Sequence, residues 1–237
     1  MDKTIPEGFE KLLRICGLRP DLPPLIPRIA ALPVDAERGY PIPYFVAYID
    51  GKPDFRIADG EKFVLCIRNR WCWVCGQPLG VHLSFVIGPM CAITRTTAEP
   101  PAHHDCAHWS IRGCPFMMRP KMVRREGGFK DSPDHADPGG IMITRNPGVM
   151  CHWTTKAFAI FKDDKGKPLI QVGEPESVTW WQEGRSAKRH EVLASIESGM
   201  PELIKACHME KTPADAEHAL AELDRQRHEA ERWLPAV

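Results

Sequence analysis

Four metal-ligand residues, arranged as two pairs, constrain the fold of this chain more than any other feature of its sequence. Cys72 and Cys75 form a Cys-x2-Cys pair that Gly76 follows directly, and His103 and Cys106 form a His-x2-Cys pair farther along. Three thiolates and one imidazole fill the tetrahedral shell that Zn²⁺ prefers in structural sites. The spacing therefore predicts one structural zinc ion that joins two separate segments.

The cysteine content favours metal or burial over disulfides. The 237-residue chain has nine cysteines, and its first eight residues are too polar for the apolar core of a signal peptide. No stretch approaches the uninterrupted apolar length that a transmembrane helix needs. Because disulfides are rare without an export route, we expect a cytoplasmic protein that has no membrane partner.

Composition divides the chain into four parts and predicts the α+β class. Residues 1–40 form a proline-rich N-terminal arm, and 41–118 form a zinc-binding α+β unit. Residues 119–140 form a linker loop, basic and then acidic, and 141–237 form an antiparallel sheet with two or three helices. The arm's prolines exclude a sustained helix after Gly17, although a short helix is expected over 7–16.

Turn and cap signals place the elements of the zinc-binding unit. Asp50-Gly51 predicts a tight hairpin over 44–57, and Asp59 predicts the cap of a helix that ends near Arg68. After the cysteine pair, 81–87 and 91–97 have the pattern of two strands separated by the Gly88-Pro89 turn. A helix is expected over 102–112.

The C-terminal part shows five strand-like runs followed by helical patterns. The runs cover 140–145, 148–154, 157–162, 169–172 and 177–181. Ser186 then has the position of a cap for a helix that Gly199 ends, and Thr212-Pro213 opens the last helix. These patterns predict the sheet and helices of the α+β class.

Helix geometry explains the second ligand pair. His103 and Cys106 lie three positions apart, which places both on one face of the expected helix. Three neighbours leave the ligand set open, since Cys91 can replace one of the four and His104 can replace His103. Cys114 reaches the ion only if the chain folds back.

A cysteine knuckle, a hairpin and a ligand-bearing helix, together spanning residues 70–113, resemble the treble-clef class of zinc-binding units. The arrangement is distantly similar to HNH-type endonucleases, which carry a histidine general base on the hairpin beside a divalent ion. That resemblance implies His82 as the general base and matches His108 to a histidine behind the last zinc ligand. This chain has no tandem His-His or Asp-His on the strand.

A binding function is the main prediction. The 31 basic and 31 acidic residues of the whole chain balance, so any anionic partner requires a local patch. The segment 112–130 is such a patch, and its basic residues stand among the aromatic residues Trp109, Phe116 and Phe129, where they can contact phosphates and stack on bases. The predicted DNA or RNA contacts are Arg112, Arg119, Lys121, Arg124, Arg125 and Lys130.

Three alternatives to this prediction stay open. The basic segment can be a plain solvated loop, or the chain can be an HNH-like, metal-dependent endonuclease. It can also be an adaptor or inhibitor that binds a protein partner through its arm and last helix. A zinc shell closed by four protein ligands excludes catalysis at that metal, but whether the protein is an enzyme is left open.

Overall fold

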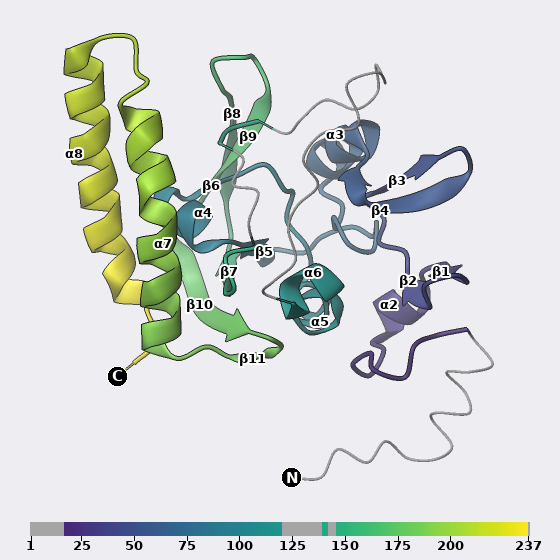
Figure 1. Cartoon of the computed structure of the whole chain (residues 1–237). Helices are drawn as coiled ribbons and strands as arrows, with labels where there is room; N and C mark the ends of the chain where they lie inside the picture. Colours follow the sequence, from purple (N-terminus) through teal and green to yellow (C-terminus); the bar gives the residue numbers. More distant parts are fainter. Residues whose placement is uncertain (1–16, 120–138, 142–145, 237) are drawn as a thin grey trace.

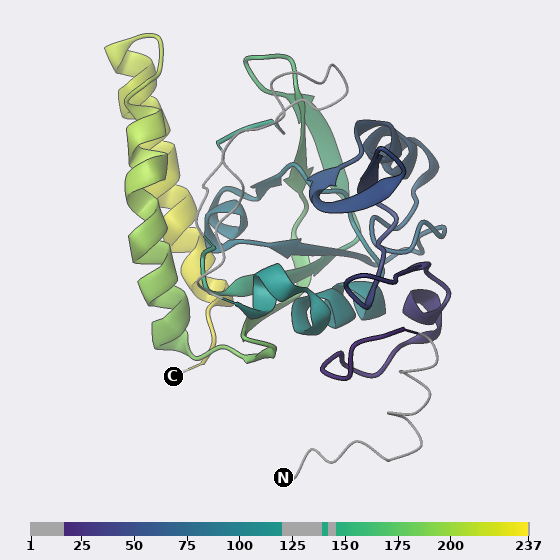
Figure 2. The same ribbon diagram turned by 45° about the vertical axis from the view of Figure 1, so that its right-hand side comes forward.

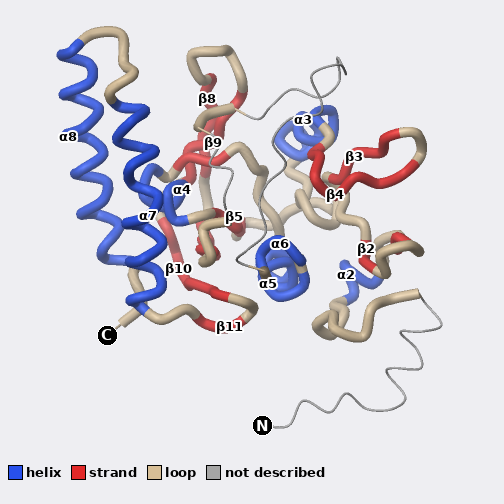
Figure 3. The backbone as a smooth tube through the Cα atoms, viewed as in Figure 1, coloured by secondary structure: helices blue, strands red, loops and turns tan. Residues whose placement is uncertain are grey.

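The computed structural model describes residues 17–119, 139–141 and 146–236. Within these ranges the protein is a mixed α+β structure that combines several small antiparallel sheets with helices, as the sequence predicts (Figure 1). Figure 3 shows a pair of long helices along one side of the molecule, one group of strands next to them and a second group of strands toward the opposite side. None of the described helices combines the length and the apolar character needed to cross a bilayer.

The largest sheet joins strands from both halves of the chain. Its strand order is β11-β10-β7-β5, with bounds Arg185–Ser186, Pro175–Gln182, Met150–Thr155 and Leu83–Ile87. β5 pairs with β7 in a register that places Leu83 opposite Thr155 and Ile87 opposite Cys151. All six residues of β7 are buried, as expected for a strand covered on both faces. The predicted zinc-binding and C-terminal units therefore share hydrogen bonds within one sheet.

A second sheet confirms the predicted strands near 157–172. β6 (Thr96–Thr97), β9 (Pro168–Val172) and β8 (Phe158–Lys162) form it in that order. The turn between β8 and β9 depends on Asp163, whose carboxylate accepts hydrogen bonds from the backbone N–H groups of Lys165 (2.9 Å) and Lys167 (2.8 Å). This is the Asx-type turn that aspartate favours.

Two shorter strand pairs lie in the N-terminal half: β1 (Val34–Asp35) with β2 (Tyr40–Pro41), and β3 (Val46–Ile49) with β4 (Lys52–Ala58). The hairpin expected over 44–57 is confirmed. Asp50 and Gly51 have φ values of 51° and 75°, which are the positive angles of the predicted turn type. Helix α3 (Gly60–Asn69) follows, and the Asp59 carboxylate caps it as expected.

The two long helices pack side by side, and both contact the short helix α4 (Pro89–Thr94) (Figure 2). They are α7 (Arg189–Cys207) and α8 (Pro213–Ala230), followed by the one-turn helix η1 (Glu231–Trp233). The main core lies between them and the strands, and it includes Phe85, Trp153, Val192 and Leu223. Trp180 donates its indole N–H to the Trp233 carbonyl oxygen at 2.7 Å, which attaches the C-terminal turn to β10.

The prediction of a strand over 91–97 is wrong for most of this range. Residues Pro89–Thr94 form helix α4, and only Thr96 and Thr97 are extended. Pro89 takes the first helical position, where its missing N–H has no cost, and Met90 and Ile93 are buried at helical spacing. No hairpin therefore forms over 81–97.

The predicted start of α7 at Ser186 and its predicted end at Gly199 are both wrong. Ser186 lies in β11, and the helix begins after Lys188, whose backbone N–H donates to the Glu191 carboxylate at 2.7 Å. The helix does not end at Gly199. A Cβ at Gly199 would lie 2.8 Å from the sulfur of Met90, so this glycine allows α4 to approach α7.

The proline-rich arm contacts the body of the protein. Leu18, Leu22 and Ile29 are buried in a second core cluster together with residues of the cysteine-rich segment. One helical turn, α2 (Pro27–Ala30), forms in the arm because Pro27 stands at its first position. The helix expected over 7–16, most of the 119–140 loop and most of the 140–145 strand lie outside the described residues.

Candidate metal centre

The first ligand pair lies in a tight knuckle after α3. Trp71 and Pro78 form an antiparallel bridge, and Cys72 donates its backbone N–H to the Gln77 carbonyl oxygen at 2.7 Å. Gly76 has a φ of 71°, and a Cβ there would lie 2.8 Å from the Tyr44 ring. Both the backbone angle and the ring therefore require glycine at this position.

The second ligand pair lies at the N-terminus of α5 (His104–Gly113), which confirms the helix expected over 102–112. His103 is the N-cap residue and Cys106 lies in the first turn. Ala102, just before the helix, exchanges both backbone hydrogen bonds with Ser84 of β5, at 2.7 and 2.9 Å. The ligand-bearing turn is thereby fixed to the edge of the main sheet.

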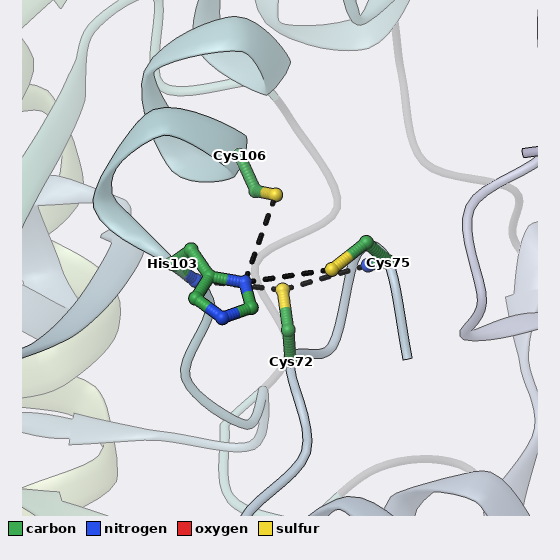
Figure 4. A group of neighbouring side chains, drawn as sticks. All are labelled: Cys72, Cys75, His103 and Cys106. Atoms are coloured by element: carbon green, nitrogen blue, oxygen red, sulfur yellow. Dashed lines mark hydrogen bonds between the residues drawn. The ribbon is translucent and has the colours of Figure 1, made fainter. Parts of the chain in front are cut away.

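The four side chains converge on one point (Figure 4). Their ligand atoms all lie within 4.8 Å of one another, with the His103 Nδ1 atom 3.4 Å from the Cys75 sulfur and 3.9 Å from the Cys106 sulfur. Tetrahedral zinc with ordinary bond lengths places neighbouring donor atoms about 3.5–3.8 Å apart. The Cys72, Cys75, His103 and Cys106 group can hold a metal ion such as zinc, as the spacing predicts.

Hydrogen bonds orient the ligands. The second ring nitrogen of His103, Nε2, lies 2.9 Å from the Pro78 carbonyl oxygen. A proton on Nε2 leaves the Nδ1 lone pair directed at the sulfur atoms, as metal-binding histidines require. The Cys72 sulfur accepts the backbone N–H groups of Cys75 (3.5 Å) and His103 (3.4 Å). These donors stabilise a thiolate at Cys72.

The thiol groups differ in acidity. Hydrogen bonds from Cys106 and then Cys75 hold the pKa of the Cys72 thiol well below its usual value. The hydrogen bond to Cys72, followed by that to Cys75 and by burial, raises the pKa of Cys106. Metal binding at this group would require each ligand cysteine to be a thiolate, so it would release the protons of those cysteines that are still protonated.

An ion pair connects the arm to this centre. Arg28 of α2 contacts the Asp105 carboxylate at 2.7 Å, and the other Asp105 oxygen accepts the Cys106 backbone N–H at 2.9 Å. Both charged side chains are about two-fifths exposed, at 40% and 41%, so the pair adds little stability by itself. It does place the arm directly over the turn that carries Cys106.

The three alternative ligands lie outside the converging group. Cys91 is on α4 beside the main core, and Cys114 ends α5, where burial raises the pKa of its thiol. The exposed His104 ring packs against His152 instead. Among the described residues, the Cys72 quartet is the one set of three or more such side chains whose ligand atoms converge.

His82 lies directly before β5, away from any such group among the described residues. Its side chain is 62% exposed, and its Nδ1 atom lies 2.5 Å from the Glu176 carboxylate. Glu176 also contacts Lys156 at 2.6 Å. The strand that follows His82, β5, pairs with β7, so the hairpin on which the endonuclease resemblance places a general base does not form.

The predicted basic patch is described only in part. Arg112 and Arg119 are exposed, while Lys121, Arg124, Arg125 and Lys130 lie outside the described residues. Trp109, counted among the interleaved aromatic residues, is 8% exposed and packs in the second core cluster. It is therefore a core residue and not a stacking surface.

Sequence reasoning missed a histidine cluster beside this centre. His104 of α5 packs on His152 of β7 with ring centroids 4.7 Å apart, and its centroid is 6.4 Å from that of His108. Burial, followed by the nearby His104 and His108 rings, lowers the pKa of His152 to about 4. The i, i+4 spacing of the helical pair was visible in the sequence, but nothing marked His152 as their neighbour.

Comparison with known protein families, with curated proteins and with solved structures finds no match for this chain.

Proposed function

We propose that this protein is a zinc-binding module in which one Zn²⁺ has a structural role. The observation that carries the proposal is the convergence of four protein ligand atoms, supported by the backbone N–H groups on the Cys72 sulfur and by the contact of the second His103 nitrogen with the Pro78 carbonyl oxygen. Such a shell leaves no position for substrate, which is typical of structural zinc. The ion would hold together the knuckle and α5, and the arm packs against both.

The treble-clef resemblance supports this role in part. A knuckle with the first ligand pair and a helix with the second at its N-terminus are both present. Between them stand β5 and α4 in place of two paired strands. We therefore propose a treble-clef-like unit whose expected hairpin partner is replaced by a strand from the C-terminal half.

We further infer that the bound partner is a nucleic acid. The zinc ion would fix the N-terminus of α5, while Arg112 lies exposed in its last turn and Arg119 lies exposed after α6 (Pro115–Met118). The sequence that follows is strongly basic. Phosphate contacts from such a segment need no base-specific geometry.

Elemental analysis of protein purified under reducing conditions tests the metal. We expect one tightly held zinc per chain in the wild type and in Cys207→Ser, which changes a cysteine of α7 outside the quartet. Cys72→Ser should lose the ion. Wild-type protein that holds no zinc after equilibration with it would overturn the proposal.

Binding of labelled single- and double-stranded DNA and RNA, measured against salt concentration, tests the partner. Arg124→Ala combined with Arg125→Ala should weaken binding and reduce the salt slope by about two, since each phosphate contact contributes about one. The control is Lys205→Ala with Arg227→Ala, which removes the same charge from exposed positions on α7 and α8. Equal effects of the two double variants would contradict the inference.

A further inference from the structure

Strand β8 (Phe158–Lys162) has the composition of an interior strand, but it lies at the edge of its sheet. In the sheet β6-β9-β8, β9 is its one strand neighbour among the described residues. The turn of the β8–β9 hairpin points outward at the top of Figure 1. The strand contains no proline, and its last residue, Lys162, carries its only charge. Edge strands are usually protected by such residues, and this one has few of them.

Both faces of β8 are open to solvent. Successive side chains of a strand point to opposite faces, so Ile160 and Phe161 lie on different faces, and their exposed fractions are 47% and 40%. The neighbouring strand β9 is instead buried at Leu169, Ile170 and Val172. A large apolar side chain on each face of a solvent-exposed edge favours pairing with a further strand. The edge of β8 is therefore a candidate interaction surface.

This edge also presents backbone groups that can pair. In an antiparallel pair, alternate residues exchange hydrogen bonds with the partner strand. Ala157 accepts the backbone N–H of Gly173 at 3.0 Å, so Ala157 and the odd-numbered residues after it bond to β9. The N–H and C=O groups of Phe158, Ile160 and Lys162 therefore point the other way, to a side where no strand of the described residues lies.

We propose that β8 pairs antiparallel with β8 of a second copy of this chain. The register that overlaps the whole strand places Ile160 opposite itself on a two-fold axis and Phe158 opposite Lys162. All of these residues direct their backbone groups to the free edge, so the pair would form about six hydrogen bonds between the copies. The two three-stranded sheets would then continue as one.

The side chains of β8 fit this pairing with itself. Ala159 of one copy lies opposite the larger Phe161 of the other, so a small residue faces each ring. The two Phe161 rings become diagonal neighbours, a separation that aromatic side chains can span. On the other face, the two Ile160 side chains meet directly. The pairing would thus cover the apolar side chains that β8 exposes.

The charges at the ends of β8 select the register. In the fully overlapped pair, Lys156 of one copy comes near Asp164 of the other, just beyond the strand ends. Both residues are exposed, and Lys156 remains 60% exposed although it contacts Glu176. A register shifted by two residues pairs less of β8, and in one direction it places Lys156 opposite Lys162. Like charges directly opposite each other are destabilising, so the self-complementary register is favoured.

Such a contact closes on itself, so association would stop at two copies. A pair of five-residue strands is a small interface, and we therefore expect a weak, reversible dimer. The inference depends on neither the zinc nor the nucleic-acid proposal.

Sedimentation equilibrium of the zinc-loaded full chain, over a wide range of concentration and under reducing conditions, tests the proposal. We expect a monomer–dimer equilibrium in the wild type. Ile160→Lys should stay monomeric, because it places two ammonium groups opposite each other on the two-fold axis. The control is Val64→Lys, which introduces the same charge at an apolar residue of α3 that is 59% exposed. It should dimerise as the wild type does.

Mixing two variants tests the register. Ile160→Glu alone should also be monomeric, because it places two carboxylates on the axis. An equal mixture of Ile160→Glu and Ile160→Lys should dimerise again, since opposite charges then meet there. An edge that binds a different protein would not give this recovery.

Hydrogen exchange resolved by residue locates the contact without a variant. The amides of Phe158, Ile160 and Lys162 should become protected only at concentrations where the dimer forms, while Ala159 and Phe161 are protected throughout. Protection of the first three in the monomer would mean that another segment of the chain covers the edge, and it would overturn the proposal. So would a wild type that is still monomeric at about 1 mM, an Ile160→Lys variant that dimerises as the wild type does, or a mixture that does not recover.

Discussion

Buffering free zinc over several orders of magnitude should change the stability of this protein by a calculable amount. The folded chain brings four ligand atoms within 4.8 Å of one another, whereas unfolding separates the knuckle from α5. A ligand bound by the folded state alone stabilises it by RT ln(1 + [Zn]/Kd). For one ion, the free energy of unfolding therefore rises by about 1.4 kcal/mol for each tenfold increase in free zinc above Kd.

The increment can be converted into a melting temperature. For a chain of 237 residues, the entropy of unfolding near 60 °C is about 0.5 kcal/mol per kelvin. Each tenfold increase in free zinc above Kd should therefore raise Tm by about 3 °C. Two ions bound together would give about twice that slope.

Thermal unfolding followed by circular dichroism in zinc buffers, under reducing conditions, supplies the measurement. Cys72→Ser should give a flat response over the range in which the wild type responds, while Cys207→Ser should follow the wild type. A wild-type Tm that does not change with free zinc would refute the reasoning. A Tm of Cys72→Ser that still rises with free zinc would refute it as well. The first result would mean that the quartet does not bind the ion, and the second that another site does.

Three further substitutions have defined outcomes. Gly76→Ala should weaken zinc binding about tenfold in a chelator competition. A positive φ costs a residue with a side chain about 1–2 kcal/mol, and the Tyr44 ring obstructs the new methyl group. The control is Gly51→Ala, which also has a positive φ but open space around it, and it should leave zinc affinity unchanged. Arg28→Ala should lower the urea-unfolding free energy by at most about 1 kcal/mol, with zinc content intact, and a loss of zinc would assign this ion pair a larger role. Glu191→Gln should lower the free energy of unfolding by about 1 kcal/mol at neutral pH, because the Arg185 guanidinium holds the pKa of the Glu191 carboxyl at about 2. A carboxyl group whose pKa is lowered on folding stabilises the protein at pH values above its ordinary pKa of 4.5. The stability difference between the wild type and Glu191→Gln must therefore shrink as the pH falls from 4.5 towards 2.

The ligand quartet was predictable because its information is local. Cys-x2-Cys before glycine and His-x2-Cys at a helix start each specify their own backbone geometry, and the metal chemistry requires the two pairs to meet. The hairpin over 44–57 and the α3 cap were predictable for the same reason. In each case a few adjacent residues carry the whole signal.

The failures concern contacts between distant segments. The 91–97 segment has the β-branched composition of a strand, yet its first part is helical because Met90 packs where Gly199 leaves space on α7. β5 pairs with β7, not with the next run along the chain. The position of His152 beside α5 follows from that pairing, so the histidine cluster could not be found from spacing alone.

The pairing of β5 with β7 has a consequence for how the protein is made. On the ribosome, the segment from Cys72 to Cys106 is complete before β7 exists, and β5, with its apolar side chains, has no sheet partner during that interval. Unpaired apolar strands are prone to aggregation. The Ser84–Ala102 bridge occupies one edge of β5, and early zinc capture would secure that bridge. We expect zinc-starved cells, and cells that express Cys72→Ser, to accumulate the chain in the insoluble fraction; equal solubility with and without zinc would argue against this protective order of events.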